Sequence, residues 1–350
     1  FRNHFKSSFR VCSLLTQSPG SRKHVHQTVR ALNLVWDERN KDIFTYVDGE
    51  VVPRSNPKAS VPLWDSGFLH GKQIWSSPRL INGKIFRLQD HLDKMRHGIE
   101  ALHCPVIPRD EDFIDAVRKV LIANKMHNAS DVHIRIIFTP GTQVTASMNM
   151  KAVVDWNGNP VAPRIIVMPE YRTMESVYDK DRGVKAIISS YRRPSPEFAD
   201  QKIHSNNQIH SSLACDEATR FGASAAFMLD AEDNLAETHA SHIAIVKDGV
   251  LYTPFVRCCP PGVTRKVILE LCESNGIPAM EDDINKQRLF EADEVMILGT
   301  MSGPVRVTHI NEKLVKDIKA ANLTEQISKL YSDAMKEEKN LYDIFQHRIV

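Results

Sequence analysis

Three features between residues 199 and 264 carry groups suited to one kind of chemistry. A lysine, Lys202, lies in the polar segment Ala199 to Asn207, and a carboxylate, Glu237, follows in the sequence Leu-Ala-Glu-Thr-His. Pro261-Gly262-Val263-Thr264 then begins a predicted helix, with proline near its first turn. A lysine can form a Schiff base, a carboxylate can keep a pyridine nitrogen protonated, and a helix start can bind phosphate. Together these are the three requirements of pyridoxal 5′-phosphate (PLP).

Hydrophobic patterns predict the elements that carry these groups. A helical pattern follows the lysine and ends at Gly222. An apolar strand over 225–229 comes next, and Asp248-Gly249 predicts a hairpin turn. A second helix is expected at 264–273, since Asn275-Gly276 is a good helix stop.

The first half alternates hairpins and helices. Turn dipeptides and apolar spacing predict two hairpins, two helices and a strand: residues 43–53, 79–87, 89–103, 110–123 and 132–138. The second half adds strands at 165–168, 184–190, 295–298 and 305–308, and an amphipathic helix at 325–344. The chain is therefore predicted to be an α/β protein.

Composition shifts divide the chain into five segments. Residues 1–41 form a basic leader, 42–153 a small α/β domain, 154–163 a linker rich in turn formers, 164–322 a larger cofactor-binding domain, and 323–350 a C-terminal helix. The first 36 residues hold six Lys or Arg and no acid, which is typical of a mitochondrial transit segment. The alternative is a disordered tail that carries no targeting signal, and the protein would then be cytoplasmic.

Bulk properties exclude several classes of protein. The chain has 350 residues, of which 42% are hydrophobic and 25% charged, so it can bury a substantial core. No apolar run approaches the roughly 20 residues of a membrane span. Six scattered cysteines favour a reducing compartment. His239 and His242 have H-x-x-H spacing without a third ligand nearby, so no metal site is expected, and the spread of charge does not favour nucleic-acid binding.

Short motifs in order along the chain resemble one enzyme family. Tyr46-Val47-Asp48-Gly49, Gly67-Phe68-Leu69-His70-Gly71 and Ile85-Phe86-Arg87-Leu88 are similar to motifs of the small domain of class IV aminotransferases, the fold-type IV PLP enzymes. Asp248-Gly249-Val250, Pro261-Gly262-Val263-Thr264 and the run from Ala292 to Thr300 resemble motifs of its large domain. The resemblance covers roughly 44–312. It implies a small α+β domain and a larger domain with a mixed, barrel-like sheet and flanking helices.

The resemblance assigns a role to each candidate residue. Lys202 would form the Schiff base and move the α-proton, and Glu237 would face the pyridine nitrogen. The remaining cofactor contacts would be to the phosphate: Arg87, Gly262, Val263, Thr264 and Thr300. Met301, Tyr46 and Phe68 would line the substrate pocket, although core packing is an alternative for the two aromatic residues. A homodimer is implied.

One departure from the family pattern concerns the lysine. Counting back from Glu217 in the following helix places Lys202 one or two residues early, and His204 competes for its position. In an extended segment the two side chains point the same way, about 6.6 Å apart. No tyrosine follows the lysine to meet the ring hydroxyl; Asn206 or Asn207 would substitute.

The expected activity is PLP-dependent transamination. A branched-chain amino acid would exchange its amino group with 2-oxoglutarate or another 2-oxo acid. A β-elimination lyase on the same fold is one alternative. A non-catalytic PLP-binding homologue is the other, if His204 rather than Lys202 occupies the Schiff-base position.

Overall fold

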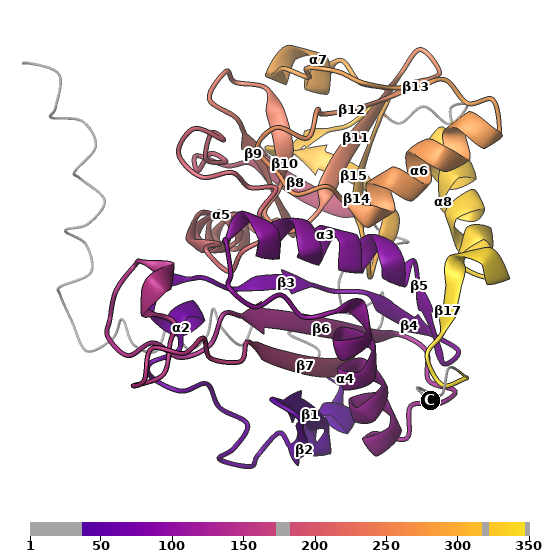
Figure 1. The fold of residues 1–350 in the computed structure, drawn as a ribbon. Helices are drawn as coiled ribbons and strands as arrows, with labels where there is room; N and C mark the ends of the chain where they lie inside the picture. Colours follow the sequence, from indigo (N-terminus) through magenta and orange to yellow (C-terminus); the bar gives the residue numbers. More distant parts are fainter. Residues whose placement is uncertain (1–36, 173–182, 317–321, 347–350) are drawn as a thin grey trace, which may run out of the picture. The chain divides into compact units, whose positions relative to one another are not determined.

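The computed structural model describes residues 37–172, 183–316 and 322–346 (Figure 1). Contacts divide the chain into two units, Phe1–Trp36 and Asp37–Val350, and all described residues belong to the second. Most of the predicted basic leader therefore lies outside the described residues, and its targeting role stays a prediction. The 3₁₀ helix η2 (Glu38–Asp42) begins within the last residues of the leader, and the Asp37 carboxylate caps it.

The first sheet has eight strands among the described residues, all paired antiparallel (Figure 1). They are β1 (Phe44–Val47), β2 (Glu50–Pro53), β3 (Ile74–Ser76), β4 (Arg79–Ile81), β5 (Lys84–Phe86), β6 (Val132–Thr139), β7 (Arg164–Tyr171) and β17 (Leu341–Asp343). The two predicted hairpins, β1–β2 and β4–β5, are confirmed. Asp48 and Asn82 adopt positive φ in their turns, as such hairpin dipeptides require.

Two helices cover one face of this sheet. They are α3 (Leu88–Ala101) and α4 (Asp110–Ala123), both close to their predicted bounds. Alternate residues of β6, Ile134, Ile136 and Phe138, share one hydrophobic cluster with the apolar stripes of both helices. Because side chains alternate along a strand, the intervening His133 and Arg135 are directed to the opposite face.

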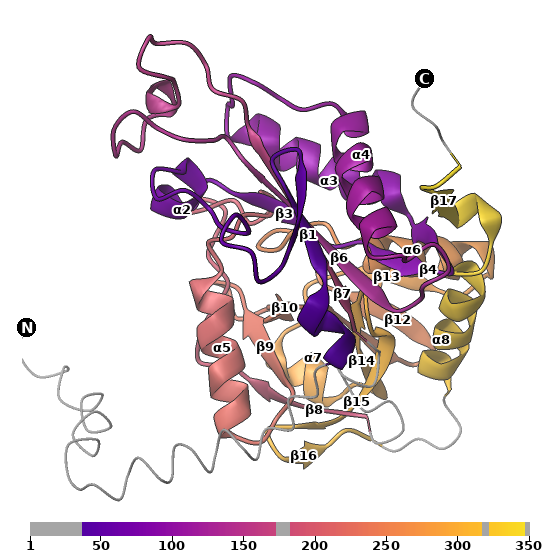
Figure 2. The same ribbon diagram turned by 90° about the horizontal axis from the view of Figure 1, so that it is seen from below.

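The second sheet has nine strands among the described residues and is mixed. They are β8 (Val184–Ile188), β9 (Ala225–Leu229), β10 (Leu235–Thr238), β11 (His242–Lys247), β12 (Val250–Thr253), β13 (Ala279–Glu281), β14 (Glu294–Gly299), β15 (Gly303–Ile310) and β16 (Lys313–Leu314). The pairs β8–β9, β8–β15 and β12–β13 are parallel. The expected mixed, curled sheet is therefore present (Figure 2).

Strand β11 is buried on both faces. Ile243 and Ile245 belong to the cluster inside the curled sheet. Ala244 and Val246 pack under α6 (Val263–Ser274) and α8 (Leu323–Ala334) on the other side. This two-sided burial explains why the sequence shows a continuous apolar run here instead of alternation. The other helices are α2 (Ser66–His70), α5 (Ile209–Arg220), α7 (Lys286–Phe290), η3 (Met150–Ala152) and η4 (Glu338–Asn340).

Two predictions about the second half need correction. The helix expected at 325–344 ends at Ala334, because residues 341–343 form β17 and pair with β5 instead. The linker at 154–163 does not separate the two sheets. β7, which follows it, pairs along its whole length with β6 in the first sheet.

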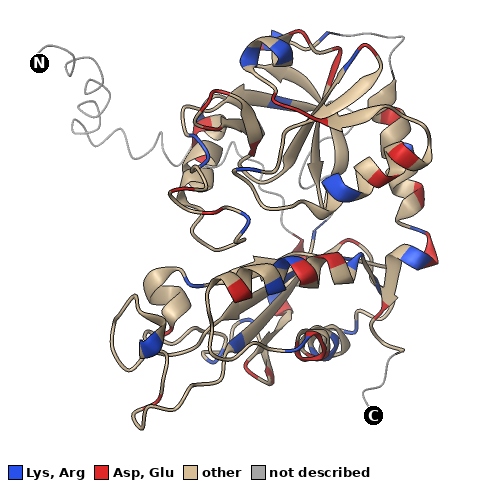
Figure 3. Ribbon diagram, turned by 45° about the horizontal axis from the view of Figure 1, so that its top comes forward, with Lys and Arg blue, Asp and Glu red and all other residues tan. Residues whose placement is uncertain are grey.

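Charged residues of both signs are distributed over the helices, whereas the strands are largely uncharged (Figure 3). Two interactions join helices of the different sheets: Arg87 binds Glu270 of α6, and Lys266 of α6 binds Asp90 of α3. Among the described residues no helix combines the length and apolar character that crossing a bilayer requires.

Candidate active site

Glu237 lies on β10, where every residue is buried. Its carboxylate forms an ion pair with Arg193, which lies in the chain between β8 and α5. Both side chains are less than a tenth exposed. A carboxylate in such a place needs a charged partner, because burial of a single charge is costly.

Arg193 is held by four interactions. Beyond Glu237, its Nε donates to the Cys258 carbonyl at 3.1 Å, and Nη1 donates to His210 Nε2 at 2.9 Å and to Ser211 Oγ at 2.8 Å. These partners come from three separate segments. The planar guanidinium fork can satisfy them together, which a lysine in this position could not do.

One further titratable group, Lys94, acts on this carboxylate. Burial raises the pKa of Glu237 to about 7, while Arg193 and Lys94 act in the opposite direction. Burial also lowers the pKa of Lys94, on α3, to about 8, and Glu237 partly offsets this. The Lys94 ammonium also interacts electrostatically with His204 and His242, so an amine does reach the neighbourhood of Glu237.

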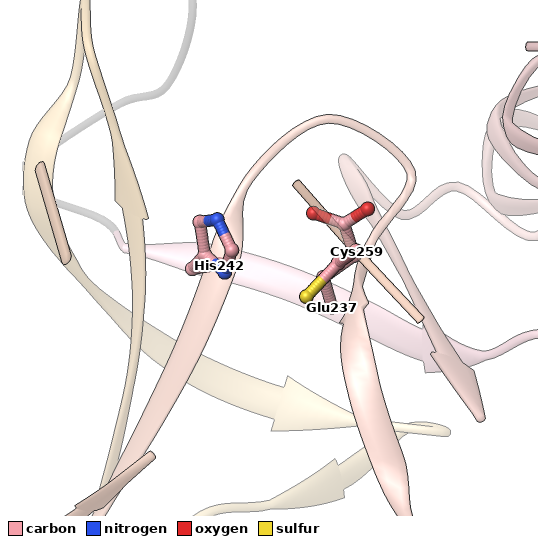
Figure 4. Close-up of side chains that lie close together, drawn as sticks. All are labelled: Glu237, His242 and Cys259. Atoms are coloured by element: carbon pink, nitrogen blue, oxygen red, sulfur yellow. The ribbon is translucent and has the colours of Figure 1, made fainter. Parts of the chain in front are cut away.

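His242 and Cys259 also lie close to Glu237 (Figure 4). One potential ligand atom of each of the three residues lies within 4.8 Å of the others, and all three are buried. Burial lowers the pKa of His242 to about 3 and raises that of the Cys259 thiol well above its usual value. We call Arg193, Glu237, His242 and Cys259 the Glu237 cluster.

Three of the predicted phosphate-binding residues lie at the start of α6. Gly262 is the N-cap residue, and Val263 and Thr264 form the first turn. The first N–H groups of a helix have no intrahelical partner, so this end can bind an anion. Thr264 Oγ1 also lies 3.4 Å from the Tyr331 hydroxyl. A Cβ at Gly262 would overlap the His242 ring, so only glycine allows this close approach.

The structure does not place Lys202 near Glu237. Its side chain is exposed, and its backbone N–H donates to the Asp200 carboxylate at 2.9 Å. In the described structure its amine makes no hydrogen bond or ion pair. The side chain therefore points to solvent, as most lysine side chains in proteins do.

His204, in contrast, is buried against β3. Its carbonyl accepts from the Trp75 N–H at 3.1 Å, and its Nδ1 donates to the Trp75 carbonyl at 2.6 Å. The two rings stack with centroids 3.9 Å apart. Burial holds the pKa of His204 well below its ordinary value, so the ring is neutral, and Nε2 carries the free lone pair.

Arg87 forms ion pairs with Asp90 and Glu270, outside the Glu237 cluster. It occupies the N-cap position of α3 with φ of 52°. Its side chain binds Asp90 and makes a two-pronged contact with Glu270, at 3.0 and 3.1 Å. The guanidinium thus joins α3 to α6 and does not face the Glu237 cluster through any described contact.

The predicted substrate residues are spread over different environments. Tyr46 is buried in the core of the first sheet, whereas Phe68, on α2, is 60% exposed. Thr300 is half-buried in the turn after β14. Met301 is buried, and its carbonyl accepts from Arg79 Nη1 at 3.3 Å. The described contacts do not bring these four residues together with Glu237.

Sequence reasoning missed Lys94, Arg193 and Cys259. One signal was available for Lys94: His91 and Lys94 have i, i+3 spacing on a predicted helix, so they share a face. His91 is buried and hydrogen-bonds Ser76. Arg193 and Cys259 gave no signal, because their approach to Glu237 depends on how separate loops fold together.

The two sheets and the buried carboxylate beside a helix start identify a class of protein. A model of the protein family "Amino-transferase class IV" matches residues 77–310. The chain therefore belongs to the class IV aminotransferases, a family of PLP-dependent transferases.

The similar proteins are named as branched-chain-amino-acid or as D-alanine aminotransferases. The chain is 32% identical over 292 residues to "Branched-chain-amino-acid aminotransferase-like protein 1" of Arabidopsis thaliana, covering 83% of this chain and 50% of that protein. It therefore spans about half the length of that relative. It is 28% identical over 294 residues to the "D-alanine aminotransferase" of Listeria monocytogenes serotype 4b, covering 81% of this chain and 93% of that one.

A solved structure supports the fold. The branched-chain amino acid aminotransferase from Thermobaculum terrenum, described as the PLP form, superimposes with a TM-score of 0.70 at 20% identity. The match covers 85% of this chain and 94% of that one. At this identity the likeness concerns the fold alone.

The residues fit PLP in part. Glu237 is a buried acid able to face a pyridine nitrogen, and the α6 start offers N–H groups to a phosphate. The fit fails at Lys202, whose amine is exposed, and a neutral imidazole at His204 is buried instead. This arrangement does not provide a covalent link through Lys202.

Proposed function

We propose that the chain binds a pyridoxal-type cofactor at the Glu237 cluster and the α6 start, without a covalent link to Lys202. The observation that carries this proposal is the contrast between two neighbours in the sequence. Lys202 is exposed and its amine makes no hydrogen bond or ion pair in the described structure, whereas His204 is buried, stacked on Trp75 and neutral.

Binding and covalent attachment are tested separately. The purified chain is titrated with PLP by equilibrium dialysis. It is then treated with borohydride, and its peptides are mapped by mass spectrometry. We expect saturable binding and no pyridoxyl group on Lys202. A pyridoxyl group on Lys202, or the absence of binding, would contradict the proposal.

Variants test which residues hold the cofactor. Glu237→Gln removes the charge that would face the pyridine nitrogen, and we expect PLP affinity to fall about tenfold. Glu232→Gln, at an exposed acid on the preceding turn, is the matched control and should leave affinity unchanged. Lys202→Ala should also leave it unchanged, and a loss equal to that of Glu237→Gln would sink the proposal.

Transamination of a branched-chain amino acid with 2-oxoglutarate or a similar 2-oxo acid is the second candidate function. The observation that favours it is Lys94, an amine near Glu237 with a pKa of about 8. When bound, PLP withdraws electrons from the amino acid. Lys94 would then accept and return a proton, a role suited to a pKa near neutrality.

Product analysis separates the remaining alternatives. The chain with PLP is incubated with L- and D-amino acids, with and without 2-oxoglutarate, and amino-group transfer is followed. Transfer abolished by Lys94→Met but kept in Lys202→Ala supports this candidate. Pyruvate release without an acceptor indicates the lyase instead. We also propose a homodimer, from the family resemblance, and light scattering tests it. Mitochondrial targeting is tested by locating the tagged chain in cells.

A further inference from the structure

The His204 ring presents one hydrogen-bond acceptor of fixed identity. Its Nδ1 lies 2.6 Å from the Trp75 carbonyl oxygen, which can only accept, so Nδ1 carries a proton. Burial holds the pKa of the ring well below its ordinary value, so the ring is neutral and Nε2 is the acceptor. Nε2 has no partner among the described hydrogen bonds, although the side chain is only 8% exposed.

The surrounding structure holds the ring in this orientation. The Trp75 N–H donates to the His204 carbonyl at 3.1 Å, and Trp75 Nε1 donates to the Ser205 carbonyl at 3.2 Å. The two rings stack with centroids 3.9 Å apart. A turn of the imidazole that exchanged its two nitrogens would place an acceptor against the Trp75 carbonyl. Nε2 therefore stays the nitrogen that is directed away from Trp75.

His204 shares its charged neighbours with the Glu237 cluster. Lys94 and Arg193 act electrostatically on His204, and the same two residues act on the Glu237 carboxylate. Arg135 is a third positive group that acts on the His204 ring. A lone pair among positive groups accepts an uncharged hydrogen-bond donor more easily than a further cation, because like charges repel strongly in a poorly solvated site.

The forms of a pyridoxal-type cofactor differ at one position only. All carry the pyridine nitrogen and the phosphate, whereas the substituent at carbon 4′ is an aldehyde, an alcohol or an amine. In the proposed function Glu237 faces the nitrogen and the α6 start binds the phosphate, so neither distinguishes these forms. Carbon 4 lies across the ring from the nitrogen, so a different residue must face its substituent. Counting along the sequence assigns His204 to that position.

We propose that His204 makes the site prefer the alcohol form, pyridoxine 5′-phosphate, over the aldehyde form, PLP. The hydroxyl donates its O–H to Nε2, whereas an aldehyde oxygen can only accept and leaves Nε2 without a partner. The ammonium of pyridoxamine 5′-phosphate also donates, but it adds a cation beside Lys94, Arg135 and Arg193. This preference rests on the proposed function, because it concerns the same site. The alcohol cannot form a Schiff base, so the site would hold the cofactor in a form that does not react with amino acids.

Calorimetric titration of the full chain tests this preference. The probes are pyridoxine 5′-phosphate, pyridoxamine 5′-phosphate, PLP and 4′-deoxypyridoxine 5′-phosphate, which has a methyl group at the variable position. We expect the alcohol to bind about tenfold more tightly than the aldehyde or the methyl compound, the effect of one net hydrogen bond, and the amine to lie between them. The alcohol and the methyl compound lack a carbonyl, so their comparison is free of reaction with any lysine.

Variants of the histidine show whether Nε2 is responsible. His204→Phe keeps a ring that can stack on Trp75 but has no acceptor, and we expect the affinities for alcohol and methyl compound to become equal. His204→Gln supplies an acceptor again and should restore part of the preference. His97→Phe, at an exposed histidine of α3, is the matched control and should keep the tenfold difference. Thermal melts show that each variant folds, and the four titrations of the unchanged chain stand without them.

The outcomes separate this preference from the proposed function. Equal affinities for alcohol, aldehyde and methyl compound, or a preference that persists in His204→Phe, would overturn the role of His204 and leave the proposed function intact, because PLP still binds. Tighter binding of the amine than of the alcohol would also overturn it, since charge would then decide. If none of the four compounds binds, the proposed function fails and the preference fails with it.

Discussion

The His204 segment, residues 203–206, and the Glu237 cluster lie near each other but are held by different forces. The first is attached to β3 by backbone hydrogen bonds and by ring stacking on Trp75, with a neutral histidine at its centre. The second is built around a buried ion pair, Arg193–Glu237. One region therefore depends on packing and the other on charge.

This difference matters for what each region can tolerate. A segment fixed by its backbone keeps its path when one side chain changes, since most of its hydrogen bonds remain. A buried ion pair fails when either partner is lost, because the other charge stays desolvated. We therefore expect substitutions in the Glu237 cluster to cost more than those in the His204 segment.

The largest effect is expected from Arg193→Met. It leaves Glu237 buried without its partner, and we expect the free energy of unfolding to fall by about 3 to 5 kcal/mol in urea denaturation. Arg192→Met is the control, because Arg192 pairs with Asp233 on an exposed surface and should cost less than about 1 kcal/mol. Equal losses would mean that the Arg193–Glu237 pair does not depend on burial as described.

Acid should destabilise the chain through its buried histidines, of which His204 and His242 lie one in each region. Burial lowers the folded-state pKa of His91, His133, His204 and His242, so their contribution is complete above the unfolded value of about 6.5 and is lost as pH falls below it. Glu237 acts oppositely, because its pKa is raised to about 7.

The free energy of unfolding is expected to fall by several kcal/mol between pH 7.5 and 5.5, since each buried histidine loses about 1.4 kcal/mol per pH unit below its unfolded pKa and Glu237 offsets only part of this loss. Urea denaturation at the two pH values measures it. His204→Gln should reduce the pH dependence, because one of the four groups is then absent. Stability that does not change with pH would contradict the lowered folded-state pKa values of these rings.

A smaller effect is expected from His204→Ala. Loss of the Trp75 stack and one hydrogen bond should reduce the free energy of unfolding by about 2 kcal/mol. Lys202→Ala, two residues away and exposed, should change it by less than about 0.5 kcal/mol. The reverse order would mean that Lys202, not His204, is the buried member of the pair.

The smallest effect is expected from Arg87→Gln. This arginine joins α3 to α6 through Glu270, whose side chain is 44% exposed. We expect a loss of about 1 kcal/mol, and that loss should shrink in high salt because solvent screens the pair. A loss that salt does not change would assign Arg87 a buried role.

Much of the fold was predictable because its signals are local. The Asp48-Gly49 and Asn82-Gly83 turns fix their hairpins, and helical spacing located α3 and α4 within two residues. The end of α8 was not predictable. Residues 341–343 read as part of an amphipathic helix, but an edge strand of the first sheet was available for pairing, and that contact is distant in sequence.

The candidate site was predictable only in its acid and its helix start. Glu237 and Gly262 could be found from residue type and order. The choice between Lys202 and His204 could not, because the segment is not extended as expected: Lys202 lies in a turn closed by the Ile203 N–H and the Asp200 carbonyl, and only His204 is held against β3. Arg193 carries no spacing signal, since its partners come from three separate segments of the chain.

The positions of β7 and β17 determine how the chain can be divided. Both strands come from sequence beyond residue 163, yet β7 lies between β6 and β1, and β17 extends the far edge beyond β5. A break in the loop at 154–163 would therefore yield an amino-terminal fragment whose sheet lacks one interior strand, β7, and one edge strand, β17. Such fragments should be insoluble alone and recover structure only when refolded together.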